Sequence, residues 1–470
     1  MLDLLIKGGK VVTEGSVVDA DVGVKNGLIA GVFQSGLLNE ATRTMDASGK
    51  LVIPGVIDAH FHCRTIGSVH TIMADDMVTG TISAAHGGVT TIMPFVWGNR
   101  GQPFDGVMRT FKEESRSKAV LDYGAHCGVR PDFDLIKGIP KVLEMGIRSF
   151  KLILDYRRTG DGRMSDPDHL MAAMELIGRI GGIAMCHAED GYIIDYLENQ
   201  YIAKGQTAPK YFIESRPPLT EARSVRTAVE IGRLVGCPVY IVHVTAKEAL
   251  EEVIAAQARH QVVFGETCPQ YLTLTNDEVL KQGGLAKVGP PLRFQEDIEE
   301  LWRGIGSGAI TIVASDHAAM TMETKRKAKD FFEVPFGMPC VETMLPVMYS
   351  EGVAKGRIPL PKMVELLCEN PARRFGLYPK KGTLKVGSDA DIVIFDPNQE
   401  WTLSIDKLHG AYDYTCYEGW KVKGKPVLSL LRGQVLLENG KLQQKPGFGQ
   451  FIEQRKVDHG TLSVFQTDGR

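Results

Sequence analysis

The chain has 470 residues, of which 43% are hydrophobic and 24% are charged, as expected for a globular protein with one large domain and a smaller one. A formal net charge of -3, without a basic patch or acidic tail, disfavours nucleic-acid binding and favours a small-molecule partner. The sequence shows no signal peptide and no apolar run long enough to span a membrane, and its eight cysteines lack CxxC spacing, so we expect a cytoplasmic protein with reduced thiols.

The first fifty residues have the pattern of short β-strands. DLLIKGGKVV and DVGVKNGLIAGV are β-branched runs broken by Gly-Gly and by Asn-Gly, and Asn-Gly is a strong hairpin signal. A matching pattern returns near the other end, in ADIVIFDP and LSLLRGQVLLENGKL. We therefore expect residues 1–52 and 379–470 to form one small β-sandwich domain. The final segment, VDHGTLSVFQTDGR, is polar enough for a loose tail or a subunit-contact arm.

The middle of the chain alternates short apolar runs with amphipathic stretches, the pattern of parallel strands linked by helices. The eight runs are LVIPGVIDAH, VTTIMPFV, LDYGAHCGV, RSFKLIL, GIAMCHAE, VYIVHV, QVVFGET and ITIVASDH. Eight strands in this order are the number that closes a barrel. A doubly wound open sheet is the alternative, but no GxGxxG follows the first strand. We predict an α/β fold with a (β/α)8 TIM barrel over residues 53–378.

Reactive side chains stand on five of these runs, mostly at their ends. They are His60 and His62 on the first run, Lys151 in the fourth, His187 on the fifth, His243 on the sixth and Asp316 on the eighth. The carboxyl ends of barrel strands face the active site, so we expect these residues to converge there. Two histidines spaced by two point the same way from a strand and can bind one ion, although an isolated HxH pair is weak evidence.

Lys151 differs from the others because an ammonium group cannot ligate a cation. One interpretation is an ion pair with a nearby carboxylate. The other is carbamylation by carbon dioxide, which would give N6-carboxylysine, an anionic group able to bridge two metals. Four histidines, one aspartate and such a bridge suit two divalent ions, with zinc the first choice. Two ions of this kind can share a hydroxide nucleophile and polarise a carbonyl.

Longer motifs run along nearly the whole chain. They are PGVIDAHFH, GIRSFKLILDY, CHAED, IVHVTAKEAL, GETCPQYL, GPPLR, SDHA and ENPARRFGLYPKKGTLKVGSDADIVIFDP. With these motifs the chain resembles the amidohydrolase superfamily and, within it, the cyclic amidohydrolases dihydropyrimidinase and D-hydantoinase, with allantoinase and dihydroorotase as relatives. The resemblance implies a barrel, a β-sandwich made from both termini, and assembly as a homotetramer or dimer.

The resemblance also implies a role for each residue. His60, His62 and Asp316 would hold one metal ion, His187 and His243 would hold the other, and carboxylated Lys151 and a hydroxide would bridge them. Asp316 would also act as the general base. Tyr156 aligns with a tyrosine that stabilises the oxyanion, the alternative being an ordinary strand-end tyrosine. His317 would orient the site rather than ligate.

The chain departs from the hydantoinase pattern in the expected substrate pocket. Gly289 stands where the family usually has serine, so a backbone contact to the ring amide could survive but a hydroxyl contact could not. Phe336-Gly337 stands where Asn-Gly is typical, and Cys340 where glycine is common. These changes leave the substrate less defined than the metal site.

Arg64 points to a different substrate. His60, His62 and Arg64 reproduce the HxHxR arrangement of dihydroorotases, in which the arginine holds a substrate carboxylate. Against this, Phe95 stands where dihydroorotases have a carboxylate-binding asparagine, and Tyr156 is typical of hydantoinases. The other interpretation of Arg64 is a loop salt-bridge partner.

Three functional hypotheses follow. The first is metal-dependent hydrolysis of a cyclic ureide or imide, such as a dihydropyrimidine or a 5-substituted hydantoin. The second is an allantoinase- or dihydroorotase-like hydrolase of an anionic ring. The third is a non-catalytic scaffold of the dihydropyrimidinase-like type, although such relatives lack the metal ligands and this chain keeps all six positions.

Overall fold

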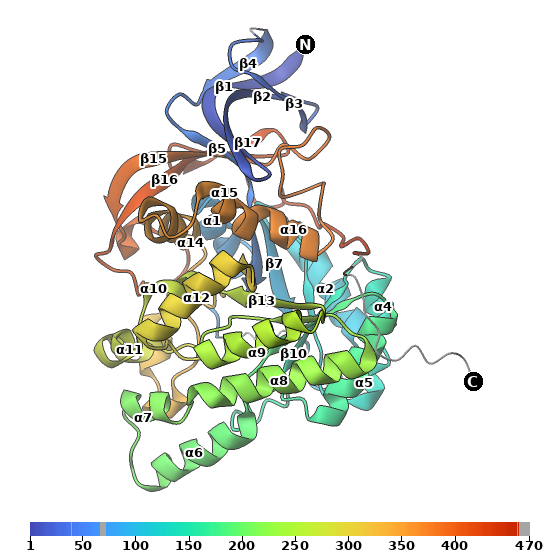
Figure 1. Ribbon diagram of the computed structural model, residues 1–470, viewed down its shortest axis with the longest axis vertical. Coiled ribbons are helices and arrows are strands. Elements are labelled where there is room, and N and C mark those ends of the chain that lie inside the picture. Colours follow the sequence, from blue (N-terminus) through green and yellow to red (C-terminus); the bar gives the residue numbers. More distant parts are fainter. Residues whose placement is uncertain (39, 66–71, 458, 460–470) are drawn as a thin grey trace, which may run out of the picture.

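The computed structural model describes residues 1–38, 40–65, 72–457 and 459. Figure 1 shows a β-sheet domain at the end of the molecule that carries the N-terminus and a larger barrel with its helices beyond it. The polar tail anticipated at the end of the chain lies almost entirely outside the described residues. Within the described ranges, no helix has the length and apolar character that crossing a membrane requires.

The smaller domain is one mixed sheet that joins the two ends of the chain, in the strand order β18-β17-β16-β15-β5-β1-β2-β3, with β4 paired to β1. Its strands are β1 (Leu2–Thr13), β2 (Ser16–Lys25), β3 (Leu28–Gln34), β4 (Ala41–Asp46), β5 (Leu51–Pro54), β15 (Ile392–Thr402), β16 (Lys421–Leu431), β17 (Gln434–Glu438) and β18 (Lys441–Leu442). Side chains from both halves, such as Val22 and Ile394, are buried in one core. The expected β-domain built jointly from both termini is confirmed.

Short turns set the register of this sheet. Asn26-Gly27 connects β2 to β3 with φ values of 52° and 77°, and Asn439-Gly440 connects β17 to β18 with 51° and 74°, the left-handed conformations of a two-residue hairpin turn. The Gly8-Gly9 pair does not interrupt β1. Instead, the pairing of β1 with β2 shifts by a bulge between Ile6 and Gly9, and the strand continues.

The larger domain is a parallel sheet in the order β14-β13-β12-β11-β10-β9-β7-β6, with β8 paired to β7. Its strands are β6 (Val56–Phe61), β7 (Val89–Val96), β8 (Asp122–Tyr123), β9 (His126–Gly128), β10 (Ser149–Ile153), β11 (Ile183–His187), β12 (Val239–Ile241), β13 (Val263–Thr267) and β14 (Ile310–Val313). A parallel bridge between Phe61 and His317 brings the chain after β14 back to β6. The predicted barrel is confirmed, with its third strand split into β8 and β9.

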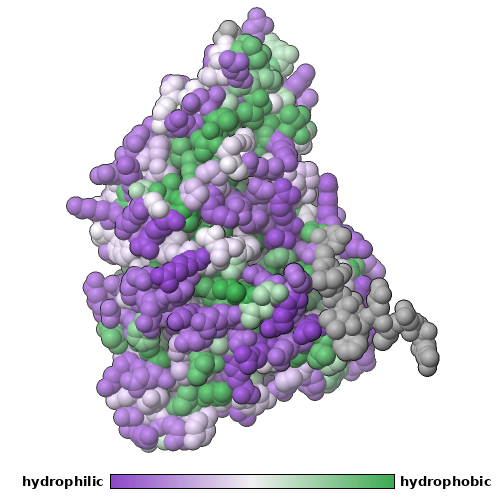
Figure 2. Space-filling view, viewed as in Figure 1, coloured by the Kyte–Doolittle hydropathy of each residue, from purple (hydrophilic) through white to green (hydrophobic). Residues whose placement is uncertain are grey.

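Helices surround this barrel, as Figure 1 shows. They are α1 (Thr79–His86), α2 (Phe104–Arg116), α3 (Phe133–Ile136), α4 (Ile139–Leu143), α5 (Pro167–Arg179), α6 (Gly191–Ala203), α7 (Pro209–Glu214), α8 (Pro218–Val235), α9 (Lys247–Ala258), α10 (Pro269–Thr273), α11 (Asn276–Gln282), α12 (Gln295–Ser307), α13 (Met322–Arg326), α14 (Met344–Val347), α15 (Leu360–Val364) and α16 (Asn370–Arg374). The longest, α8, packs on α5 and α9 and ends at Gly236 in a left-handed cap with φ 67°. The face in Figure 2 is mostly hydrophilic, with a hydrophobic band over the terminal sheet.

A buried ion cluster fastens the two domains together. Lys381, which follows α16, places its Nζ 2.6 Å from Asp122 of β8 and 2.9 and 2.6 Å from Asp389 and Asp391 before β15. Burial disfavours the charged lysine, but the three carboxylates outweigh it and raise its pKa. Arg432 also pairs with Asp122. The cation in this cluster is therefore a side chain of the protein itself.

Candidate metal centre

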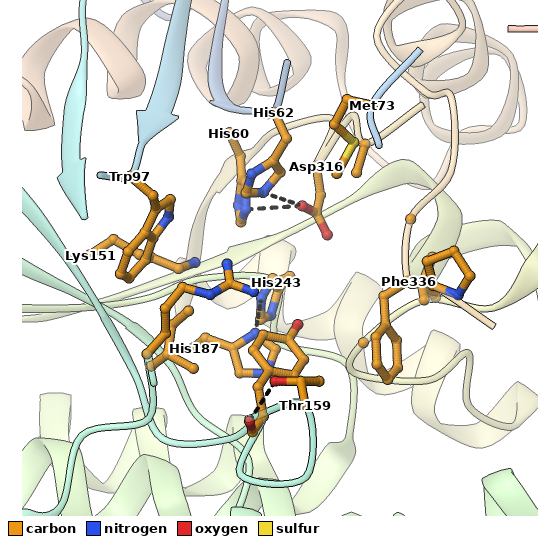
Figure 3. A pocket seen from close by; sticks show the side chains of 18 of the residues that line it. His60, His62, Met73, Trp97, Lys151, Thr159, His187, His243, Asp316 and Phe336 are labelled. Carbon is orange, nitrogen blue, oxygen red and sulfur yellow. Dashed lines mark hydrogen bonds and ion pairs between the residues drawn. The ribbon is translucent and has the colours of Figure 1, made fainter. Parts of the chain in front are cut away.

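The carboxyl ends of the barrel strands bring the six expected residues to one cavity of about 240 Å³, shown in Figure 3. His60 is the second-last residue of β6 and His62 follows that strand directly. Lys151 is central in β10 and His187 ends β11, while His243 lies two residues after β12 and Asp316 three residues after β14. The cavity is smaller than the roughly 300–1,000 Å³ typical of drug-sized ligands. It suits a small ring.

The nitrogen and oxygen atoms that face one another have the spacing of metal ligands. His60 Nε2 and His62 Nε2 lie 3.0 and 3.2 Å from Asp316 Oδ1, and His187 Nδ1 lies 3.0 Å from His243 Nε2. Two ligand atoms of one tetrahedral zinc ion, each about 2.0–2.1 Å from it, are separated by about 3.3 Å. The donor set therefore fits two divalent ions, one beside His60, His62 and Asp316 and the other beside His187 and His243.

Carboxylates hold the far nitrogens of two of these histidines. His60 Nδ1 lies 2.6 Å from Glu266 Oε1, and His187 Nε2 lies 3.1 Å from Glu189 Oε2. Burial disfavours a charged His60, but Asp316 and Glu266 outweigh it and raise its pKa to about 9. A carboxylate behind a histidine fixes the ring and leaves the opposite nitrogen facing the metal. This arrangement supports the same donor set.

Lys151 is buried in the cavity and is only 3% exposed. Its Nζ lies 4.4 Å from the centroid of the Phe95 ring, and none of the described carboxylates comes within ion-pairing distance of it. Burial is the main reason why the pKa of Lys151 is lowered to about 8, against the opposing effect of Asp316 and Glu266. The neutral amine is the form of lysine that can add carbon dioxide, so the surroundings favour carbamylation over the ion-pair interpretation.

Three residues of the site have left-handed backbone conformations. Tyr156, His243 and Asp316 have φ values of 68°, 39° and 48°, which are uncommon for residues with a Cβ. Such conformations cost about 1–3 kcal/mol each and persist where surrounding contacts impose them. Their gathering at one cavity is a further sign of a functional site.

Tyr156 lies next to the second pair of histidines. Its ring centroid is 4.8 Å from that of His187 and 5.6 Å from that of Phe336. Burial raises the pKa of Tyr156 well above its ordinary value, so its hydroxyl is a neutral donor that faces the cavity.

The expected substrate residues divide into two groups. Gly289, Phe336 and Gly337 line the cavity, whereas the structure does not place Arg64 among its lining residues. Arg64 is exposed, and its backbone N–H donates to the backbone oxygen of Asp75 at 2.8 Å.

His317 is buried behind the cavity rather than in it. Its Nε2 lies 2.9 Å from Asp75 Oδ2, and its Nδ1 accepts from the backbone N–H groups of Cys340 and Val341. His317 thus fixes the chain that follows Gly337, in the orienting position that the sequence suggested.

The sequence interpretation missed several residues of the cavity. Arg163, Trp97 and Thr159 line it, together with Met73 and Met320. Arg163 and Thr159 lie in the loop between β10 and α5, where no periodicity indicates orientation. Glu266 was also missed, although its place at the end of the seventh apolar run is the same signal that identified His187.

Comparisons with known proteins agree with this geometry. The family described as "Amidohydrolase family" matches residues 51–436. The chain is 39% identical to the D-hydantoinase of Rhizobium radiobacter over 461 residues, covering 97% of this chain and 99% of that one. A crystal structure of D-hydantoinase matches with a TM-score of 0.92 and 38% identity over 97% of this chain and 99% of that one. The dihydropyrimidinase of Brevibacillus agri NCHU1002 also has a TM-score of 0.92, at 32% identity and the same coverage.

Proposed function

Because the chain belongs to the amidohydrolase family, we propose that it is a cyclic amidohydrolase that hydrolyses an amide bond in a cyclic ureide or imide. The observation that carries the proposal is the convergence of four histidines, Lys151 and Asp316 on one small cavity. Similarity to D-hydantoinases over 97% of the chain makes dihydropyrimidines and 5-substituted hydantoins the first substrates to try.

We propose that the site holds two divalent ions, with zinc as the first choice, and the close approach of the donor atoms supports this. His60, His62 and Asp316 would hold one, His187 and His243 would hold the other, and Lys151 as N6-carboxylysine would offer an oxygen to each. When bound, two such ions lower the pKa of a water molecule and polarise the carbonyl that it attacks.

Two residues of the chain would handle the proton and the developing charge. Burial alone would raise the pKa of the Asp316 carboxyl, but His60 and the hydrogen bonds from both histidines hold it well below its usual range. The ionised carboxylate would accept the proton of the attacking water and pass it to the ring nitrogen that leaves. The Tyr156 hydroxyl would donate to the carbonyl oxygen as it becomes negative.

The test is ring opening by zinc- or manganese-loaded protein on a panel of dihydrouracil, 5-substituted hydantoins, allantoin and dihydroorotate. Tyr156→Phe should lower kcat by about 10²–10³-fold, as expected for the loss of one oxyanion donor, with metal content unchanged. The control is Tyr192→Phe, which removes the hydroxyl of a tyrosine that is 48% exposed and outside the cavity. No ring opening across the panel would refute the substrate class.

The two other hypotheses have specific tests. About two ions per purified chain would exclude a metal-free scaffold.

An anion-binding role for Arg64 has little structural support because the residue is exposed and absent from the cavity lining. Arg64→Met should leave the kinetics on every substrate of the panel unchanged, and a loss confined to dihydroorotate would revive the dihydroorotase-like hypothesis.

A further inference from the structure

A different arginine, Arg163, reaches the cavity that Arg64 does not. It lines the same cavity as the metal-centre residues, and its guanidinium carbon lies 5.4 and 5.5 Å from the ring centroids of Trp97 and Tyr156. Positions over aromatic rings hold a guanidinium in place without using its hydrogen-bond donors. Arg163 is therefore a fixed cation on the wall that also carries Tyr156.

One carboxylate holds Arg163 from the side. Asp161 Oδ2 accepts from Nε at 2.8 Å and from Nη2 at 2.5 Å. Nη1 has no hydrogen-bond or ion-pair partner among the residues that the structure describes. A guanidinium has five donors arranged as a fork, so this side-on pairing leaves the end of the fork available to a ligand. The side chain of Arg163 is 17% exposed, which keeps that end accessible.

The surroundings of Arg163 carry more positive than negative charge. Arg130, which is 5% exposed, donates through Nη1 to the backbone oxygen of Asp161 at 2.8 Å. Arg100 donates to the backbone oxygen of Gly160 at 2.7 Å. Burial lowers the pKa of Arg130, and the like charges of Arg163 and Arg100 lower it further. The side-chain carboxylate of Asp161 thus pairs with Arg163, whereas Arg130 and Arg100 contact backbone oxygens beside it.

This charge excess has a chemical consequence for the cavity. A carboxylate placed at Nη1 and Nη2 of Arg163 would make a charge-assisted pair in a site partly removed from water, which strengthens such bonds. A neutral amide at the same place would gain less, since it carries no charge for Arg163 and the neighbouring side chains Trp97, Ile153 and Val288 are apolar.

We propose that Arg163 recognises an anionic substituent on the ring, so that the preferred substrates are cyclic ureides or imides that carry a carboxylate side chain. This inference rests on the proposed ring-opening function and names its substrate class. Arg163 would act as a specificity residue, and Asp161 as the residue that positions it.

The experiment compares two hydantoins that differ only in charge: hydantoin-5-acetic acid and its side-chain amide. For the wild type, kcat/KM should be at least about 10-fold higher for the acid, the gain expected of a hydrogen-bonded charge pair. Arg163→Met should lower kcat/KM for the acid by about 10- to 100-fold and leave that for the amide within about threefold. Arg179→Met is the matched control, an exposed arginine of α5 that pairs with Glu175, and should change neither.

The outcomes separate the two proposals. If the amide is opened as well as the acid, or if Arg163→Met lowers both equally, Arg163 is structural and the inference is wrong while the ring-opening function stands. If neither hydantoin is opened although another ring of the panel is, the inference is wrong and the ring-opening function stands; if no ring of the panel is opened, the proposed function fails.

Calorimetry on wild-type protein tests the anion preference without any variant. The ring-opened products, N-carbamoyl-aspartate and N-carbamoyl-asparagine, again differ only in the side-chain charge. Binding of the first at least about 10-fold more tightly would support the inference, and equal binding would overturn it.

Discussion

Replacing Gly289 by alanine should destabilise the folded protein, because the added methyl group would meet the ring of Phe336. A Cβ built on Gly289 would lie 3.0 and 3.2 Å from Cδ1 and Cε1 of Phe336 and 3.4 Å from the hydroxyl of Tyr156. Carbon atoms prefer separations of about 3.5–4.0 Å, so the ring would have to move. Movement of the Phe336 ring away from Gly289 is restricted by two side chains. The Nζ of Lys287 lies 4.4 Å from the ring centroid, and the guanidinium carbon of Arg216 lies 5.0 Å from it.

Overpacking of this kind typically costs about 1–3 kcal/mol, and we expect Gly289→Ala to lower the free energy of unfolding by that amount. Because the displaced Phe336 ring lies beside Tyr156, with ring centroids 5.6 Å apart, kcat should fall too. In a Phe336→Ala background the clash is absent. The double variant should therefore be more stable than the sum of the single changes implies, by a coupling of about 1–3 kcal/mol.

The assay is urea unfolding of the four proteins at equal metal load, with ring-opening kinetics on the same samples. Gly106→Ala is the control, since this helical glycine has nothing within 4 Å of its Cβ position and should be neutral or stabilised. Additive effects of Gly289→Ala and Phe336→Ala would refute the reasoning, as would full stability of Gly289→Ala alone.

Three further predictions concern lysines. Protein loaded with ¹³C-bicarbonate should show a carbamate carbon signal by NMR that is absent from Lys151→Ala, and a wild-type spectrum without it would contradict carboxylation of Lys151. Lys381→Met should cost about 3–5 kcal/mol, because it removes the buried cation that three carboxylates share; a loss below about 1 kcal/mol in urea unfolding would count against this. Burial lowers the pKa of Lys325 from its usual 10.5 to about 7, so between these values the unfolded chain binds more protons and the free energy of unfolding should rise with pH. Lys325→Met should show a smaller rise in urea titrations at successive pH values.

The sequence was informative wherever side-chain direction follows a regular period. Strand alternation and the rule that barrel sites lie at carboxyl strand ends were enough to bring His60, His187 and Asp316 together before any coordinates. The suggestion for Arg64 came instead from the HxHxR resemblance, and the residue is exposed and lies three residues beyond the end of β6 at Phe61. The alternation that makes His60 and His62 neighbours no longer applies three residues beyond the strand.

Several residues that line the walls of the cavity could not be predicted from the sequence, because they lie in loops without a regular period. Arg163 lies in an irregular loop whose direction is set by Asp161 and by two aromatic rings from other segments. The contact between Gly289 and Phe336 joins two loops that belong to no common sheet, although the backbone N–H of Gly337 donates to the oxygen of Lys287. Both departures from the hydantoinase pattern were visible in the sequence, but only the coordinates show that the glycine makes room for the ring.

The joint β-domain has a consequence for synthesis of the protein on the ribosome. Strand β5 ends at Pro54 and pairs with β15, which begins at Ile392, so 337 residues, from 55 to 391, lie between the two partners. Protein synthesis adds about 5–20 residues per second. One edge of β5 therefore stays unpaired for about 17–70 s before β15 has been synthesised. Unpaired edges are where strands of other chains can add. During translation the nascent chain thus depends on protection of that edge until the barrel between the two strands has been made.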